Sequence, residues 1–175
     1  MKTPRSKVWP LSLALILISG MAVAGPETRR APAIRSSTWF NSRALGEGDL
    51  RGKVVLVEFW AFACINCQRT VPAMRTLQAT YPDVVIIGVH TPELDRERDP
   101  ANVAAAVKRL DLRFPVALDN DYAIWRAFGN QYWPALYLID KRGQIRTTHV
   151  GELHEGTVTW TALRDLIDRL RLEPA

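Results

Sequence analysis

The feature that most constrains the fold of this 175-residue chain is a pair of cysteines between an apolar run and a helix-forming segment. Cys64 and Cys67, the only cysteines of the chain, form a C-x-x-C motif that begins five residues after the apolar, β-branched run 54–59. This order predicts a buried strand followed by a helix, and in that context C-x-x-C is typical of a thiol–disulfide redox site. We therefore expect an α/β domain whose chemistry lies at the start of the helix.

The spacing of the two cysteines predicts different roles for them. Residues three apart lie on one face of a helix with Cβ atoms roughly 5–6 Å apart, so a modest adjustment allows a disulfide. We expect Cys64 at the helix N-terminus, where free N–H groups and the helix dipole favour an anion. The pKa of its thiol should therefore fall, which makes Cys64 the nucleophile. Cys67, one turn further on, should be more buried and should resolve the mixed disulfide.

Two other uses of a C-x-x-C motif remain open from the sequence. A structural zinc site needs four ligands, and the chain has no second cysteine pair. A purely structural disulfide would close a loop of four residues, which adds little entropic stability. Both arguments favour a redox-active pair. We expect Cys64 and Cys67 to carry the redox chemistry themselves, without a cofactor or a metal ion.

The first residues indicate export. Three basic residues precede an apolar stretch over residues 11–24 that ends in an A-x-A motif, the pattern of a secretory signal peptide over residues 1–24. The stretch is shorter than the about 20 residues of a membrane span. An uncleaved anchor remains the alternative, because Val8 and Trp9 lengthen the apolar run. Either way the domain should face a periplasmic or other extracytoplasmic, oxidising compartment.

Removal of residues 1–24 leaves 151 residues, the length of one domain. The removed segment contains three of the 23 basic residues and none of the 18 acidic residues. Its removal therefore lowers the net charge from +5 to +2. No basic run suggests nucleic acid, and we expect a monomer. Residues 25–45, with prolines and adjacent arginines, are predicted to be a linker with a short N-terminal strand. The domain itself is expected over residues 46–172.

Alternating strand and helix patterns predict a mixed sheet covered by helices on both faces. Further strands are expected over residues 84–89, 116–118, 135–139 and 145–150, the last two joined by a hairpin turn. Helices are expected after the cysteines, from Asp99-Pro100, over residues 121–128 and around residues 160–170.

These features together resemble the thioredoxin fold over residues 46–172. The resemblance rests on Glu58, Phe59 and Trp60 before the cysteines and on Pro72, Pro134, Gly143 and Gly151 after them. Within thioredoxin-like proteins the chain is similar to the exported TlpA/ResA group, in which a helix and a strand are inserted before the proline-containing strand. Segments 88–93 and 132–140 look like the thioredoxin-like domain of DipZ-type proteins, where that domain is fused to a membrane electron-transducing part.

The resemblance implies roles for Glu58 and Pro134. Burial raises the pKa of a carboxyl group toward neutrality, and the matching acid of thioredoxin-like proteins serves the buried cysteine. Glu58 is therefore the expected general base for Cys67, unless it faces outward or is paired structurally. These folds also place a cis-proline opposite the cysteines, so the Trp133–Pro134 bond is expected to be cis although few X-Pro bonds are. The backbone of Trp133 would then be free to pair with a substrate strand.

Four residues are expected to contact the substrate: Trp133, Pro134, Trp60 and His90. His90 follows a strand that should run parallel to residues 54–59, so His90, Pro92 and Glu93 should rim the active edge of the sheet. The alternative for Trp133 is a core tryptophan, and the alternative for Trp60 is packing in the core or at its edge.

The chain departs from the family pattern in ways that bear on function. Ala63 replaces the usual tryptophan before the first cysteine, and Ile65-Asn66 replaces Gly-Pro between the two. No cation lies between the cysteines to stabilise a thiolate, so we expect a reductant rather than a strong oxidant. The sequence thus predicts an exported thiol–disulfide oxidoreductase. It would take electrons from a membrane thiol donor and reduce a disulfide-bonded protein, for example an apocytochrome.

Two functions of other classes remain as alternatives. A copper-binding or copper-delivery module on the same fold would use both thiolates and a distal histidine such as His149, although such modules typically have a three-residue gap between the cysteines. A non-catalytic thioredoxin-like binding domain would keep an inert disulfide.

Overall fold

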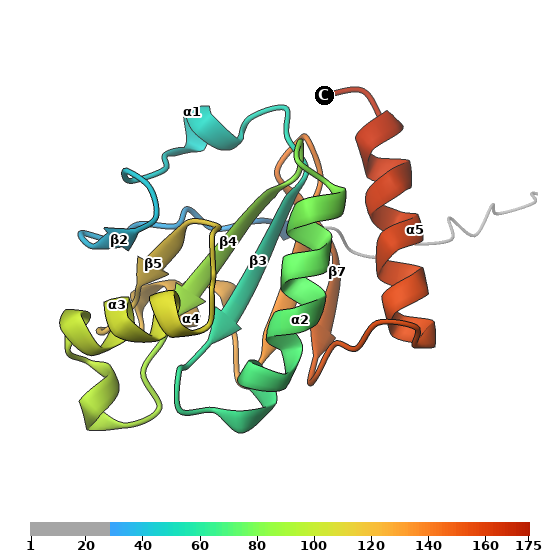
Figure 1. Ribbon diagram of the computed structural model, residues 1–175. Coiled ribbons are helices and arrows are strands. Elements are labelled where there is room, and N and C mark those ends of the chain that lie inside the picture. Colours follow the sequence, from blue (N-terminus) through green and yellow to red (C-terminus); the bar gives the residue numbers. More distant parts are fainter. Residues whose placement is uncertain (1–28) are drawn as a thin grey trace, which may run out of the picture.

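The computed structural model describes residues 29–175, and within them seven strands form one mixed sheet (Figure 1). Across the sheet the strands follow the order β1-β7-β6-β3-β4-β5-β2. The strands are β1 (Arg29–Arg30), β2 (Trp39–Phe40), β3 (Val55–Trp60), β4 (Val85–His90), β5 (Val116–Leu118), β6 (Ala135–Ile139) and β7 (Gln144–Val150). The helices are α1 (Glu47–Leu50), α2 (Ile65–Thr80), the 3-10 turn η1 (Asp95–Glu97), α3 (Pro100–Arg109), α4 (Ala123–Phe128) and α5 (Val158–Leu172).

The centre of the sheet is β3, which pairs in parallel with β4 and antiparallel with β6. Every residue of β3 and β6 is buried, because continuous apolar runs can be covered on both faces. In the turn between β6 and β7, the Asp140 carboxylate accepts hydrogen bonds from the amides of Arg142 and Gln144, and Gly143 has a φ of 79°. The predicted central strand and hairpin are confirmed.

Each face of the sheet carries its own apolar cluster. On one face, α2 and α5 cover Leu56 and Trp60 of β3, and Figure 1 shows these two helices side by side in front of the sheet. On the other face, α4 covers Val57 and Phe59. The helical spacing in the sequence predicted the four positions of α5 that are buried, which are Trp160, Leu163, Ile167 and Leu170.

Between β4 and α4 the chain adds α3 and β5, the helix and strand expected before Pro134. The side chain of Asp99 caps α3 by accepting a hydrogen bond from the Ala101 amide at 2.8 Å, and Pro100 occupies the first helical position. β5 pairs in parallel with β4. The mixed sheet, its flanking helices and this insertion confirm the predicted fold class.

Within residues 29–37, predicted as linker, Arg29–Arg30 form a strand of the sheet. β1 pairs antiparallel with β7, the Ala31 amide donates to the Gly143 carbonyl at 2.8 Å, and Ile34 is buried in the second cluster. A two-residue strand held by main-chain hydrogen bonds leaves no apolar periodicity, so the sequence could not reveal it. β2 lies within the segment where a short strand was expected. The expected signal peptide, residues 1–24, lies outside the described residues.

Gly88 of β4 lies opposite Glu58 of β3, and a Cβ atom there would come within 2.9 Å of Trp60 Nε1 and 3.1 Å of Phe114 Cε2. Both rings are buried, so neither can easily move away. We expect Gly88→Ala to lower the free energy of unfolding by about 1–3 kcal/mol, a typical cost of overpacking, as measured by urea denaturation. Gly48→Ala in α1, where nothing lies within 4 Å, is the control. Equal effects of the two substitutions would contradict the packing argument.

Candidate active site

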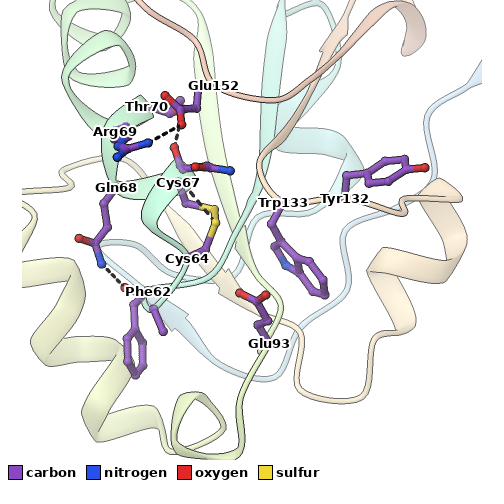
Figure 2. Close-up of a disulfide and its surroundings, with 12 residues drawn as sticks. Phe62, Cys64, Cys67, Gln68, Arg69, Thr70, Glu93, Tyr132, Trp133 and Glu152 are labelled. Atoms are coloured by element: carbon purple, nitrogen blue, oxygen red, sulfur yellow. Dashed lines mark hydrogen bonds and ion pairs between the residues drawn. A yellow bond between two sulfur atoms is a disulfide. The ribbon is translucent and has the colours of Figure 1, made fainter.

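The redox pair lies at the start of α2. Cys64 is the N-cap residue, and the helix begins at Ile65. A disulfide joins Cys64 to Cys67, with Cα atoms 5.3 Å apart (Figure 2), a usual separation for disulfides. The Cys67 amide donates a hydrogen bond to Cys64 Sγ at 3.2 Å. The predicted strand-to-helix position of the pair is confirmed.

The two cysteines differ in access to solvent. Cys64 is 9% exposed, whereas Cys67 is 1% exposed. An incoming disulfide therefore reaches the Cys64 sulfur first. A thiolate at Cys64 would also lie at the positive end of the α2 dipole and would face the Cys67 amide. Both observations support the predicted division into nucleophile and resolving cysteine.

Glu58 is a carboxylic acid in the core beneath α2. Its neighbours Leu56 and Trp60 belong to the cluster that contains Cys67, and alternate residues of a strand share one face. The Glu58 side chain therefore points toward the α2 face, and it is 2% exposed. Burial raises the pKa of Glu58 to about 8, so this carboxyl group can exchange a proton near neutral pH. Its burial rules out an outward-facing Glu58.

The loop before β6 lies beside the disulfide. The Trp133–Pro134 peptide is cis, as the resemblance implied. The Trp133 indole N–H donates to the Thr91 carbonyl at 3.1 Å, and its ring packs on Trp125 with centroids 4.1 Å apart. Figure 2 shows Trp133 near the disulfide and Tyr132 pointing away from it into solvent. Trp133 is thus a partly buried residue fixed at the edge of the site.

Trp60 and His90 were predicted to contact the substrate, and the structure contradicts this because both are buried, at 2% and 0% exposure. They are partners in register where β3 and β4 end, and the Phe62 ring stacks on the imidazole at 5.6 Å. The Phe62 amide donates to His90 Nε2 at 3.3 Å, and burial lowers the pKa of His90 to about 4. The loop after β4 folds back over the strand end, so this part of the edge is closed to solvent. Pro92 is buried with it, whereas Glu93 is exposed (Figure 2).

Glu97 in η1 is a buried residue of the site that the sequence did not reveal. Its side chain is fully buried, and Oε1 accepts a hydrogen bond from the Ala63 amide at 2.7 Å. Oε2 accepts from the amides of Glu93 and Leu94, each at 2.8 Å. Glu97 thereby joins the loop before the disulfide to the loop after β4. It lies in a run of five charged residues, a pattern typical of an exposed segment, and no apolar spacing marks it.

The polar groups on the far side of the disulfide are paired with one another. Arg69 forms an ion pair with Glu152 at 3.3 Å (Figure 2), and the ring of His149 lies 3.1 Å from the Glu152 carbonyl oxygen. Among residues 29–175, no three His, Cys, Asp or Glu side chains are grouped so that they could hold a metal ion. In the same part of the chain, no helix combines the length and the apolar character needed to cross a membrane.

Comparison with known sequences agrees with this geometry. The family model described as AhpC/TSA family matches residues 32–148. Protein DipZ of Mycobacterium tuberculosis is 44% identical over 144 residues, which cover 79% of this chain and 21% of DipZ. The thiol-disulfide oxidoreductase YkuV of Bacillus subtilis is 31% identical over 114 residues, which cover 65% of this chain and 77% of YkuV. The chain therefore spans about a fifth of the length of DipZ.

A solved structure supports the same assignment. The crystal structure of a thioredoxin-like superfamily protein superposes with a TM-score of 0.74 at 29% sequence identity. The superposition covers 83% of this chain and 98% of the other. The fold is thioredoxin-like.

Proposed function

The chain belongs to the AhpC/TSA family, and we propose that it is an exported thiol–disulfide oxidoreductase that reduces disulfides in other proteins. The observation that carries the proposal is the Cys64–Cys67 pair at the start of α2, above the buried Glu58. The similarity to YkuV, a protein named for this activity, supports the reaction class. In this proposal the two cysteines carry the electrons, and no cofactor takes part.

The first half of the reaction uses Cys64. Its thiolate attacks one sulfur of the substrate disulfide, so a mixed disulfide forms as the substrate S–S bond breaks. The second substrate sulfur leaves as a thiolate and takes a proton from solvent. The N-terminus of α2 stabilises the attacking thiolate, and the greater exposure of Cys64 lets the substrate reach it.

The second half of the reaction uses Cys67. The Glu58 carboxylate takes the proton of the Cys67 thiol, and the resulting thiolate attacks Cys64 Sγ. The Cys64–Cys67 disulfide forms as the mixed disulfide breaks, and the substrate sulfur leaves as a thiolate that takes a proton from solvent. The substrate has then gained two electrons and carries two thiols. A pKa of about 8 suits Glu58 to this transfer.

The partner peptide is proposed to bind along the main chain at Trp133 and Pro134. The Pro134 carbonyl is already occupied, because it accepts a hydrogen bond from the Gly151 amide at 3.0 Å. In the turns and loops of the described residues, the main-chain groups of Trp133 take part in no backbone hydrogen bond. An extended substrate segment can pair with such groups as an added strand. The proposed substrate is a disulfide-bonded protein, such as an apocytochrome, and the proposed enzyme acts as a monomer.

The direction of electron flow follows from the surroundings of Cys64. Ile65-Asn66 supplies no cation, and Arg69 is paired with Glu152. Since the helix terminus alone stabilises the thiolate, we expect a potential near that of thioredoxin, about −270 mV, rather than that of a strong oxidant, about −120 mV. Equilibration with glutathione or dithiothreitol redox buffers, followed by thiol alkylation, measures it. A value above about −170 mV would reverse the proposed direction and favour disulfide formation or isomerisation.

A reductant of this potential needs an external source of electrons in an oxidising compartment. We propose that a membrane protein with a thiol pair supplies them, as the resemblance to DipZ-type proteins implies. The proposal of export rests on the basic and apolar residues of segment 1–24.

A further inference from the structure

The backbone that leads into Cys64 is held by side chains from beyond β4. The Phe62 amide donates to His90 Nε2 at 3.3 Å, and the Ala63 amide donates to Glu97 Oε1 at 2.7 Å. The Cys64 amide donates to the Ala61 carbonyl at 3.3 Å. Three successive amides are thus engaged just before the nucleophile, and two of their acceptors are side chains.

Glu97 brings a buried negative charge to this backbone. Both of its oxygens act only as acceptors, as in an ionised carboxylate. No cation offsets the charge, because none of the ion pairs within residues 29–175 involves Glu97. His90 does not offset it either, since its Nε2 accepts a hydrogen bond, and its Nδ1 is buried without a partner. A buried charge of this kind is only weakly screened by salt.

We propose that Glu97 is a positioning residue for Cys64, which fixes the peptide ahead of the nucleophile and, through its negative charge, disfavours the Cys64 thiolate. The dipole of α2 favours that thiolate, so the two effects oppose each other. Glu97 limits the stabilisation of the reduced form and so keeps the couple reducing. That Glu97 keeps the enzyme a reductant rests on the proposed function. The effect of the Glu97 charge on the pKa of Cys64 does not depend on that function.

The other charged or titratable groups around Cys64 do not replace Glu97. They are Glu58 from β3, His90 from β4, Glu93 from the following loop, and Arg69 with Glu152 across α2 (Figure 2). Glu93 is exposed and therefore screened, and Arg69 is neutralised by Glu152. Glu58 holds its proton below a pH of about 8. The buried, unpaired charge of Glu97 is thus the one expected to act on Cys64 at neutral pH.

The test is Glu97→Gln, which keeps the shape of the side chain and removes its charge. In a Cys67→Ser background, where Cys64 is the only thiol, the ultraviolet absorbance of the thiolate is followed against pH. We expect the pKa of Cys64 to fall by about one unit, a tenfold change in its ionisation equilibrium. In the protein with both cysteines, the midpoint potential should rise by up to about 30 mV, the equivalent of a tenfold change.

Asp95→Asn is the matched control, because Asp95 lies in the same short helix with its side chain fully exposed. It should leave the Cys64 pKa unchanged. A folded Glu97→Gln protein that loses thermal stability but keeps the wild-type Cys64 pKa would reduce Glu97 to a structural role and overturn the proposal. Neither titration needs a substrate, so a protein that shows the shift but no turnover would refute the proposed function and leave this inference standing.

A measurement on the wild-type protein covers the case in which the variant does not fold. Amide hydrogen exchange at Ala63 should be slow, because its N–H donates to a buried carboxylate. Exchange as fast as that of an exposed amide would overturn the positioning role. Glu97→Asp, which keeps the charge, should retain a Cys64 pKa close to that of the wild type.

Discussion

Cys67→Ser will turn the protein into a trap that holds its substrate as a mixed disulfide and will abolish turnover. The serine hydroxyl cannot attack the bond between Cys64 and the substrate, so the second half of the reaction stops. Cys67 is nearly inaccessible in the structure, at 1% exposure, so its loss leaves the approach to Cys64 intact. Incubation of the variant with a disulfide-bonded model protein, followed by non-reducing electrophoresis and mass spectrometry, measures the trapped complex.

The reciprocal variant is the control. Cys64→Ser should form no complex, because the remaining thiol lies beneath the first turn of α2. In the reduced wild-type protein, iodoacetamide at mildly acidic pH should label Cys64 first, since its thiolate forms at lower pH. Equal labelling of the two cysteines, or trapping by Cys64→Ser, would contradict the assigned order of nucleophile and resolving cysteine.

The sequence predicted those parts of the site that follow from the local pattern of apolar residues or from the resemblance to thioredoxin-like proteins. The apolar run before Cys64 can be covered on both faces, so it indicated β3 and the burial of Glu58 within it. The helix after Cys64 followed from the spacing of its apolar residues. The cis bond before Pro134 followed only from the resemblance, because base rates favour trans.

The parts that the sequence did not predict depend on contacts between distant segments. Its pattern placed His90 at the carboxyl end of β4, which is correct. Whether that end is open or closed depends on how the following loop folds. Glu97 accepts hydrogen bonds from two amides of that loop and joins it to the Ala63 amide before the disulfide. Hydrogen bonds of a carboxylate to main-chain amides require no particular residue types at the other end. The charged run around Glu97 has the pattern of an exposed segment. The sequence therefore did not indicate that Glu97 is a buried residue of the site.

Glu58→Gln will remove a pH dependence of stability from the oxidised protein. Burial raises the pKa of Glu58 from 4.5 to about 8, so the folded state holds a proton that the unfolded chain releases. The stability from this group is complete below pH 4.5 and is lost as the pH rises through about 8. Glutamine resembles the protonated acid and avoids this loss. We expect the variant to exceed the wild type by a few kcal/mol in free energy of unfolding at pH 8 and above, as measured by urea denaturation.

The same substitution will slow the release of substrate from the mixed disulfide. Cys67 loses its base, and positioned general bases contribute about 10²–10⁴-fold, so we expect the resolving step to slow at least 10²-fold near neutral pH. In the wild type this rate should rise with pH toward about 8 as Glu58 ionises, and the variant should lack that rise. Glu47→Gln, the same change at an exposed position of α1, is the control and should behave as the wild type. Because the variant should fold at least as well as the wild type at this pH, a slower resolving step cannot be ascribed to unfolding. Turnover unchanged between about pH 6 and 9, on either side of a free cysteine pKa of about 8.5, would instead assign Glu58 to structure alone.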